Sequence, residues 1–108
     1  MEADVLAALL QAAARAGESV TYSEALAALG HRFSRPKMRA LCVMLDDLDT
    51  VERGVGRPPL AVLVVRQSDR LPGQGWWLGQ RGYTGEFTGP AAMAWVRARQ
   101  AEVFAAWR

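Results

Sequence analysis

The spacing of apolar residues predicts three helices in the first half of the chain. The first ends at Gly17 and buries one face, which consists of Val5, Leu6, Leu9, Leu10 and Ala13. The second begins at the capping-box sequence Thr21-Tyr22-Ser23-Glu24 and stops at Gly30. The third begins at Ser34, a good N-cap residue, with Pro36 in the first turn. Its buried face follows the i, i+3, i+4, i+7 rule and comprises Met38, Leu41, Cys42, Leu45 and Leu48.

The second half of the chain alternates turn signals with apolar segments. Glycines and prolines at positions 54, 56, 58 and 59 predict a loop, and the apolar run 60–65 then predicts a buried strand. Residues 66–70 are polar and turn-like. Residues 71–77 return as a second strand or as an irregular arm, because Pro72, Gly73 and Gly75 weaken regular pairing. A last helix is expected over residues 90–107, with an apolar face of Met93, Val96, Val103, Phe104 and Trp107.

Three helices followed by a strand and a β-arm are the order of elements in a winged helix. The expected fold is therefore α+β: a winged helix-turn-helix of three helices and a short β-wing, with an added C-terminal helix. Residues 1–108 are expected to form a single domain, because a chain of this length can bury one core without disulfides or a metal. The last helix is expected to pack back on that domain, and a partner-binding helix is the alternative.

Basic residues gather at the predicted start of the third helix. Arg35 and Arg39 are four residues apart and lie off the apolar stripe, and Lys37 projects from its other flank. The window from His31 to Arg39 contains no acid, as expected of a recognition helix that enters a DNA groove by its N-terminal end. The net charge of +2 is too small to indicate nucleic-acid binding by itself. An ordinary solvated helix face, in a chain enriched in arginine and alanine by a GC-rich genome, is the alternative interpretation.

Catalytic and metal-binding patterns are missing from the sequence. His31 is the only histidine and Cys42 the only cysteine. Cys42 is expected to be a buried structural thiol, because it lies on an apolar helix face. The acids at positions 46, 47, 49 and 52 could suggest Mg²⁺, but a solvated acidic face is favoured since no further carboxylate cluster completes a site. We therefore expect a protein that is not an enzyme and that holds neither a metal nor a cofactor.

The sequence also indicates a compartment. A single cysteine excludes an intramolecular disulfide and is typical of a reducing environment. The N-terminus lacks the basic start of a signal peptide, and no apolar run approaches the length of a membrane span. We expect a cytoplasmic protein that does not associate with membranes.

Three segments together resemble the winged-helix domain of alkylguanine-DNA alkyltransferases and alkyltransferase-like proteins. They are Val20-Thr21-Tyr22-Ser23-Glu24, the arginine-bearing helix and Val64-Val65-Arg66, and the resemblance covers residues 20–77. In that family a Pro-Cys-His-Arg segment precedes the paired valines and supplies the alkyl-accepting cysteine. Here Ala61, Val62 and Leu63 stand at the cysteine, the histidine and the arginine. The resemblance therefore implies DNA binding without alkyl transfer.

The resemblance also implies particular DNA contacts. Tyr22 matches the family's tyrosine that helps to turn the target nucleotide out. In that family an arginine fills the space that the turned-out nucleotide leaves in the base stack. Counting without gaps from Tyr22 places this arginine at Pro36, so Arg35 or Lys37 substitutes for it only with a small shift of the alignment. Arg39-Ala40 replaces a glycine pair that permits close approach to DNA.

Two functions follow from these observations. The leading hypothesis is a non-enzymatic protein that binds duplex DNA, with the candidate contact residues Tyr22, Ser34, Arg35, Lys37, Arg39 and, on the wing, Arg66 and Arg70. The alternative is a protein-interaction module, an accessory or immunity-type protein whose surface comprises Trp76, Trp77 and the C-terminal helix. The C-terminal half is also similar to small bacterial proteins, a likeness that names no function.

Overall fold

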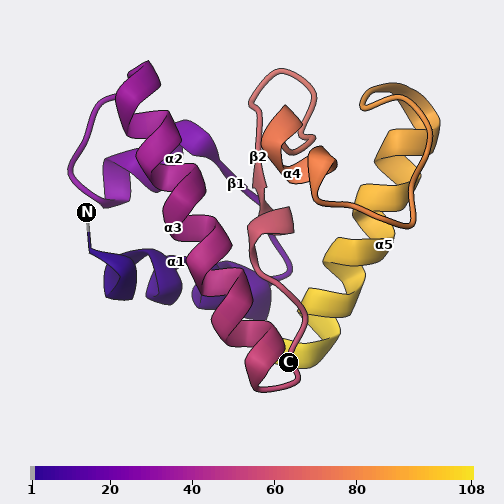
Figure 1. Ribbon diagram of the computed structural model, residues 1–108. Helices are drawn as coiled ribbons and strands as arrows, with labels where there is room; N and C mark the ends of the chain where they lie inside the picture. The colour runs from indigo at the N-terminus through magenta and orange to yellow at the C-terminus, as the bar shows by residue number, and fades with distance from the viewer. Residues whose placement is uncertain (1) are drawn as a thin grey trace.

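The computed structural model of the protein describes residues 2–108, which form five α-helices and one small parallel sheet (Figure 1). The helices are α1 (Ala3–Ala16), α2 (Tyr22–Ala28), α3 (Arg35–Gly54), α4 (Gln74–Leu78) and α5 (Gly89–Trp107). The strands are β1 (Val20–Thr21) and β2 (Val64–Val65), and a 3₁₀ turn, η1 (Ala61–Leu63), leads directly into β2. A majority of helix with a small sheet is an α+β composition.

Local signals mark the end of α1 and the starts of α2 and α3. The chain leaves α1 through Gly17, whose φ of +71° is in the left-handed region that favours glycine. At α2 the Thr21 hydroxyl accepts from the Glu24 amide at 3.1 Å, and the Glu24 carboxylate accepts from the Thr21 amide at 3.0 Å. At α3 the Ser34 hydroxyl accepts from the Lys37 amide at 3.3 Å. These contacts confirm the predicted capping box and N-cap.

The sheet joins two segments that are far apart in the sequence. Val20 pairs with Val64 and Thr21 with Val65, in parallel. The predicted strand 60–65 is buried along its whole length, but only its last two residues are extended, because the first part winds into η1. The sheet therefore ties the entry of α2 to the chain that follows α3.

The predicted β-wing is not formed. Residues 66–70 make a closed turn, in which the Arg66 amide donates to the Leu71 carbonyl at 2.8 Å and the Arg70 amide donates to the Arg66 carbonyl at 2.9 Å. The chain then enters α4 instead of returning as a strand, so β2 pairs only with β1 among residues 2–108. Burial of Trp77 explains the helix, because its indole lies in the core and donates to the Pro72 carbonyl at 3.0 Å.

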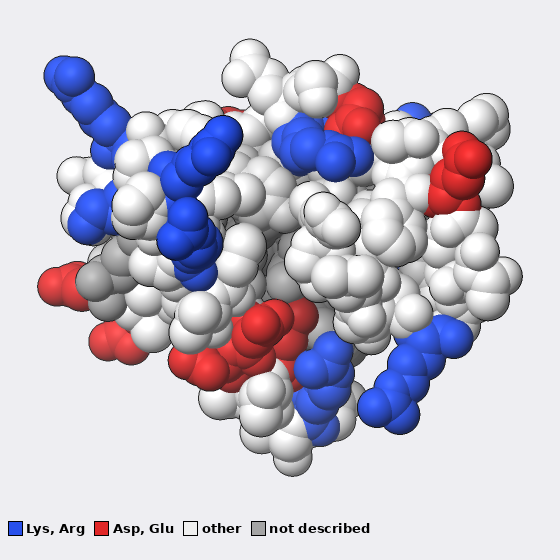
Figure 2. Space-filling view, turned by 45° about the horizontal axis from the view of Figure 1, so that its top comes forward, with Lys and Arg blue, Asp and Glu red and all other residues white. Residues whose placement is uncertain are grey.

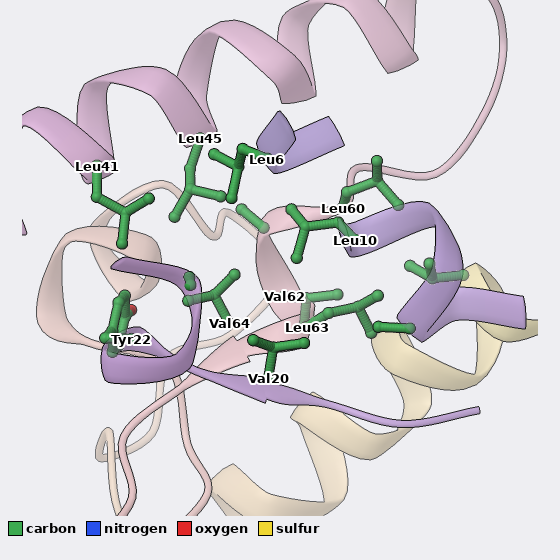
Figure 3. Close-up of a cluster of buried hydrophobic side chains, with 14 of the residues drawn as sticks. Leu6, Leu10, Val20, Tyr22, Leu41, Leu45, Leu60, Val62, Leu63 and Val64 are labelled. Atoms are coloured by element: carbon green, nitrogen blue, oxygen red, sulfur yellow. The ribbon is translucent and has the colours of Figure 1, made fainter. Parts of the chain in front are cut away.

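The hydrophobic core lies between α1, α3 and the segment η1–β2 (Figure 3). Its fully enclosed members include Leu6, Leu10, Leu26, Leu41, Leu60, Leu63 and Val64. Helix α5 packs against α1 and adds Val96 and Val103, while Met93, Phe104 and Trp107 are partly buried against the same core. The expected packing of the last helix on the rest of the chain is thus confirmed.

Aromatic rings fasten the loop between α4 and α5. Trp77 stacks on Phe87 with ring centroids 5.3 Å apart, and Tyr83 lies between Trp77 at 5.1 Å and Trp95 at 5.4 Å. A Cβ atom on Gly82 would come within 2.8 Å of the Trp95 ring, so this close approach requires glycine. The loop is held by its own aromatic contacts and not by regular backbone pairing.

Candidate nucleic-acid interface

The start of α3 carries a concentration of positive charge. Arg32, Arg35 and Arg39 are exposed and Lys37 is half-buried. In Figure 2 basic side chains gather at the left, over the end of the molecule where α3 begins. Because Arg35 and Arg39 are one helical turn apart, they project from the same side of α3.

These four basic side chains are not neutralised by the protein itself. Within residues 2–108 the ion pairs are Arg57 with Glu52, Arg66 with Asp69 and Arg99 with Glu102, so none involves the start of α3. The first acid along α3 is Asp46, about three turns after the helix begins. The free amides of the first turn add the positive end of the helix dipole. An anion that approaches this end meets uncompensated positive charge.

Ser34 has a structural role at this end of α3. Its hydroxyl is occupied by the Lys37 amide, so it fixes where α3 starts and how the neighbouring arginines are displayed. Phe33, directly before it, has 60% of its surface exposed. Phe33 was not among the surface residues predicted from the sequence. It could have been found as the one aromatic residue in the basic window 31–39.

Tyr22 does not belong to this surface. Only 8% of it is exposed, and its hydroxyl accepts a hydrogen bond from the Gly73 amide at 2.8 Å. Burial raises the pKa of the Tyr22 phenol. In the structure Tyr22 is packed in the core and bonded to the chain before α4, which gives it a structural role in place of the nucleotide contact that the resemblance implies.

Arg66 and Arg70 are engaged in local contacts. The Arg66 guanidinium donates to both carboxylate oxygens of Asp69, at 2.9 and 3.2 Å. Arg70 has a φ of +59° and donates to the Ser19 hydroxyl at 2.6 Å. Arg66 is therefore paired with an acid and lies on no β-wing. The Arg70 side chain is held by Ser19, but its charge has no acidic partner within residues 2–108.

The alternative interaction surface is also changed by the structure. Trp77 is 2% exposed and belongs to the core, so it is not available to a partner. Trp76 is half-buried and meets Trp77 edge to face, with ring centroids 4.8 Å apart. The exposed apolar residue at this place is Leu78, at the end of α4.

The acids late in α3 do not form one solvated face. Asp46 and Asp47 are exposed, but Asp49 and Glu52 are buried. Asp49 accepts from the Leu60 and Ala61 amides, and Glu52 forms a two-pronged ion pair with Arg57. The expectation of solvated acids is therefore wrong for Asp49 and Glu52, because both lie on the face of α3 that continues the buried stripe.

Cys42 is half-buried, where the sequence predicted full burial. It lines a cavity of about 70 Å³ together with Tyr22, Leu45, Asp46, Ala61, Gly75 and Trp76. Burial raises the pKa of the Cys42 thiol, and the nearby Asp46 carboxylate acts in the same direction. Both effects favour the neutral thiol over the nucleophilic thiolate.

The chain matches no protein-family model, and no curated protein or solved structure is similar enough to count as a match. Among residues 2–108, no three side chains of the types that bind metals come together. In the same range, no helix has both the length and the apolar character that a membrane span requires.

Proposed function

We propose that this protein binds duplex DNA, without catalysing a reaction, through the basic start of α3. In this proposal α2 and α3 act as a helix-turn-helix unit of winged-helix type, in which the closed turn 66–70 stands in the place of a β-wing. The contact residues are Arg32, Arg35, Lys37 and Arg39, and Ser34 positions them. Tyr22, Arg66 and Arg70 are left out because their side chains are already engaged.

One observation carries the proposal: four basic side chains gather at the start of α3, and none of them forms an ion pair within residues 2–108. Unpaired cations repel one another, which disfavours such a cluster unless an anion binds there. Arginine suits phosphate and guanine because its planar fork donates two parallel hydrogen bonds. A helix that begins at this cluster can enter a major groove with its first turn.

Salt-dependent binding tests the proposal. Affinity for random-sequence duplex DNA should fall steeply as salt rises, because each neutralised phosphate releases condensed counterions and contributes about −0.9 to the logarithmic slope. Arg35→Ala and Arg39→Ala should each make the slope shallower by about one unit if both arginines contact phosphate. Fluorescence anisotropy at several salt concentrations measures the slope directly.

Arg97→Ala is the matched control, because Arg97 is an exposed arginine on α5, away from the start of α3 (Figure 1). The control should keep the slope of the parent protein. If the two α3 variants keep the parent slope as well, the start of α3 is not the DNA-binding surface. If the parent protein does not bind duplex DNA at all, the proposed function is wrong.

A further inference from the structure

Phe33 is an exposed aromatic residue within the basic start of α3. Its exposed fraction is 60%, and no other aromatic ring among residues 2–108 pairs with it. The residue lies in the irregular segment that joins α2 to α3, directly before the N-cap Ser34. Single exposed apolar residues are common on protein surfaces, so the surroundings of Phe33 decide what its exposure means.

Packing within the protein does not account for the ring. An apolar residue directly before the N-cap often packs against the fourth residue of the helix, which here is Met38. Met38 is half-buried and packs against the hydrophobic core, but Phe33 is not among the side chains that pack there. Because most of its surface is open, the Phe33 ring is available to a partner.

The surroundings of Phe33 fit a polyanion. Arg32 precedes it and Arg35 follows it closely, and both are exposed and form no ion pair within residues 2–108. Figure 2 shows basic side chains gathered over this end of the molecule. Glu2 is an acid on the α1 side, where it lines an open groove with His31. A partner that covers Phe33 therefore needs negative charge beside an apolar surface, as a nucleic acid has in its phosphates and bases.

An anionic membrane also combines negative charge with apolar matter, but it fits this surface less well. Membrane association through an apolar face requires several apolar side chains that enter the lipid together. Phe33 is the only large apolar residue that is exposed in the window 31–39. A nucleobase has a flat face that one aromatic ring can cover, so a single phenylalanine is sufficient for stacking.

Stacking also selects the form of the nucleic acid. In an intact duplex the faces of each base are covered by the neighbouring bases, and only base edges are exposed in the grooves. A phenylalanine ring has no hydrogen-bonding group with which to read those edges. The full face of Phe33 can therefore be used only on a base that has lost a stacking neighbour.

We infer that Phe33 stacks on an unpaired base next to the duplex that the start of α3 binds, as at a single-stranded overhang. This inference rests on the proposed function and specifies the form of DNA that the same surface prefers. Arg32 and Arg35 then contact the phosphates on either side of the stacked base, while Phe33 supplies the contact that an intact duplex cannot accept.

Two DNAs that share one duplex sequence test the inference, one blunt and one with a single-stranded overhang. The parent protein should bind the overhang DNA about tenfold more tightly, which is a gain that one base–aromatic stack can supply. Phe33→Leu keeps an apolar side chain but removes the ring, so it should bind both DNAs as the parent binds the blunt one. Phe33→Trp should keep the preference. The salt dependence should be the same for the parent and Phe33→Leu, because no charge is removed.

Leu78→Ala is the matched control, because it removes an exposed apolar side chain from α4. It should keep the affinities of the parent for both DNAs. Circular dichroism should be the same for all these variants, since both substituted positions are exposed.

The outcomes separate the inference from the proposed function. If the parent binds both DNAs equally, or if Phe33→Leu keeps the preference for the overhang, the stacking role of Phe33 is wrong and duplex binding stands. If Phe33→Leu binds both DNAs as the parent does but loses affinity for phosphatidylserine vesicles, the ring enters a membrane and the inference is also wrong. A parent protein that binds neither DNA refutes both the inference and the proposed function.

Discussion

Asp49 allows a quantitative test of how α3 is fastened to the core. Only 5% of the residue is exposed, and one of its carboxylate oxygens accepts from the Leu60 amide at 2.8 Å and from the Ala61 amide at 2.9 Å. It therefore links α3 to the start of η1. Burial raises the pKa of the Asp49 carboxyl from its ordinary value of 3.8 to about 6, although the two amides oppose the shift.

This shift makes stability depend on pH in a defined direction. Between pH 3.8 and about pH 6 the folded protein holds the Asp49 proton more tightly than the unfolded chain does. The free energy of unfolding contributed by Asp49 is therefore fully present below the lower value and is lost as pH rises through the higher one. About two pKa units at about 1.36 kcal/mol per unit give a loss of about 3 kcal/mol.

Asp49→Asn isolates this contribution, because the amide oxygen can still accept from both backbone amides but does not ionise. In urea denaturation, the free energy of unfolding of the variant relative to the parent should rise by about 3 kcal/mol from about pH 4 to about pH 7. Asp49→Ala removes the acceptor and should cost about 1–3 kcal/mol for each orphaned amide. If the difference between Asp49→Asn and the parent does not change with pH, the raised pKa of Asp49 is wrong.

Two further substitutions test the core. Trp77→Ala should lower the free energy of unfolding by about 3–5 kcal/mol, because it removes a fully buried indole that is stacked on Phe87. Trp76→Ala should lower it clearly less, because Trp76 is half-buried. Equal losses of stability in thermal denaturation would contradict the assigned burial. Tyr22→Phe should cost about 1–3 kcal/mol, because the Gly73 amide loses its acceptor; an unchanged melting temperature would show that this amide finds another partner.

Helices α1, α2, α3 and α5 were predictable because their signals are local. The capping pair of Thr21 and Glu24, the N-cap Ser34 and the left-handed Gly17 act within a few residues of the positions that they define. The last helix was predictable from Pro90 and the periodic apolar face that follows it. Contacts between residues three or four apart can be predicted from their spacing in the sequence alone.

The β-wing was not predictable, because distant contacts decide the structure there. A buried apolar run such as 60–65 has the same pattern in a strand and in a 3₁₀ turn, and only the pairing with Val20 and Thr21 selects two residues as strand. The segment 74–78 becomes a helix because Trp77 enters the core. The sequence shows which residues are present in these segments, but it does not show which distant residues come into contact.

The buried acids of α3 could have been predicted. Positions 41, 45, 49 and 52 continue one helical face, on which Leu41 and Leu45 are core residues. Carboxylates at Asp49 and Glu52 therefore had to find donors inside the protein, and they bind the chain that follows α3. For the candidate site, the sequence located the basic start of α3, but it could not tell that Tyr22, Arg66 and Arg70 are already bonded.

The distribution of the arginines separates composition from function. A GC-rich genome raises the number of arginines everywhere in the chain, but it does not decide which of them find partners. Several arginines outside the start of α3 have a partner that fixes them: Arg57, Arg66 and Arg99 pair with acids, Arg70 bonds to Ser19, and Arg15 lies over the Trp107 ring. The start of α3 differs, because its arginines are close in sequence, exposed and free of acids. Arg53, Arg81 and Arg97 are also exposed and form no ion pair within residues 2–108, so the lack of a partner does not by itself distinguish the start of α3. The clustering of several such side chains in a window without acids does, and it is the reason to look for an anionic partner there.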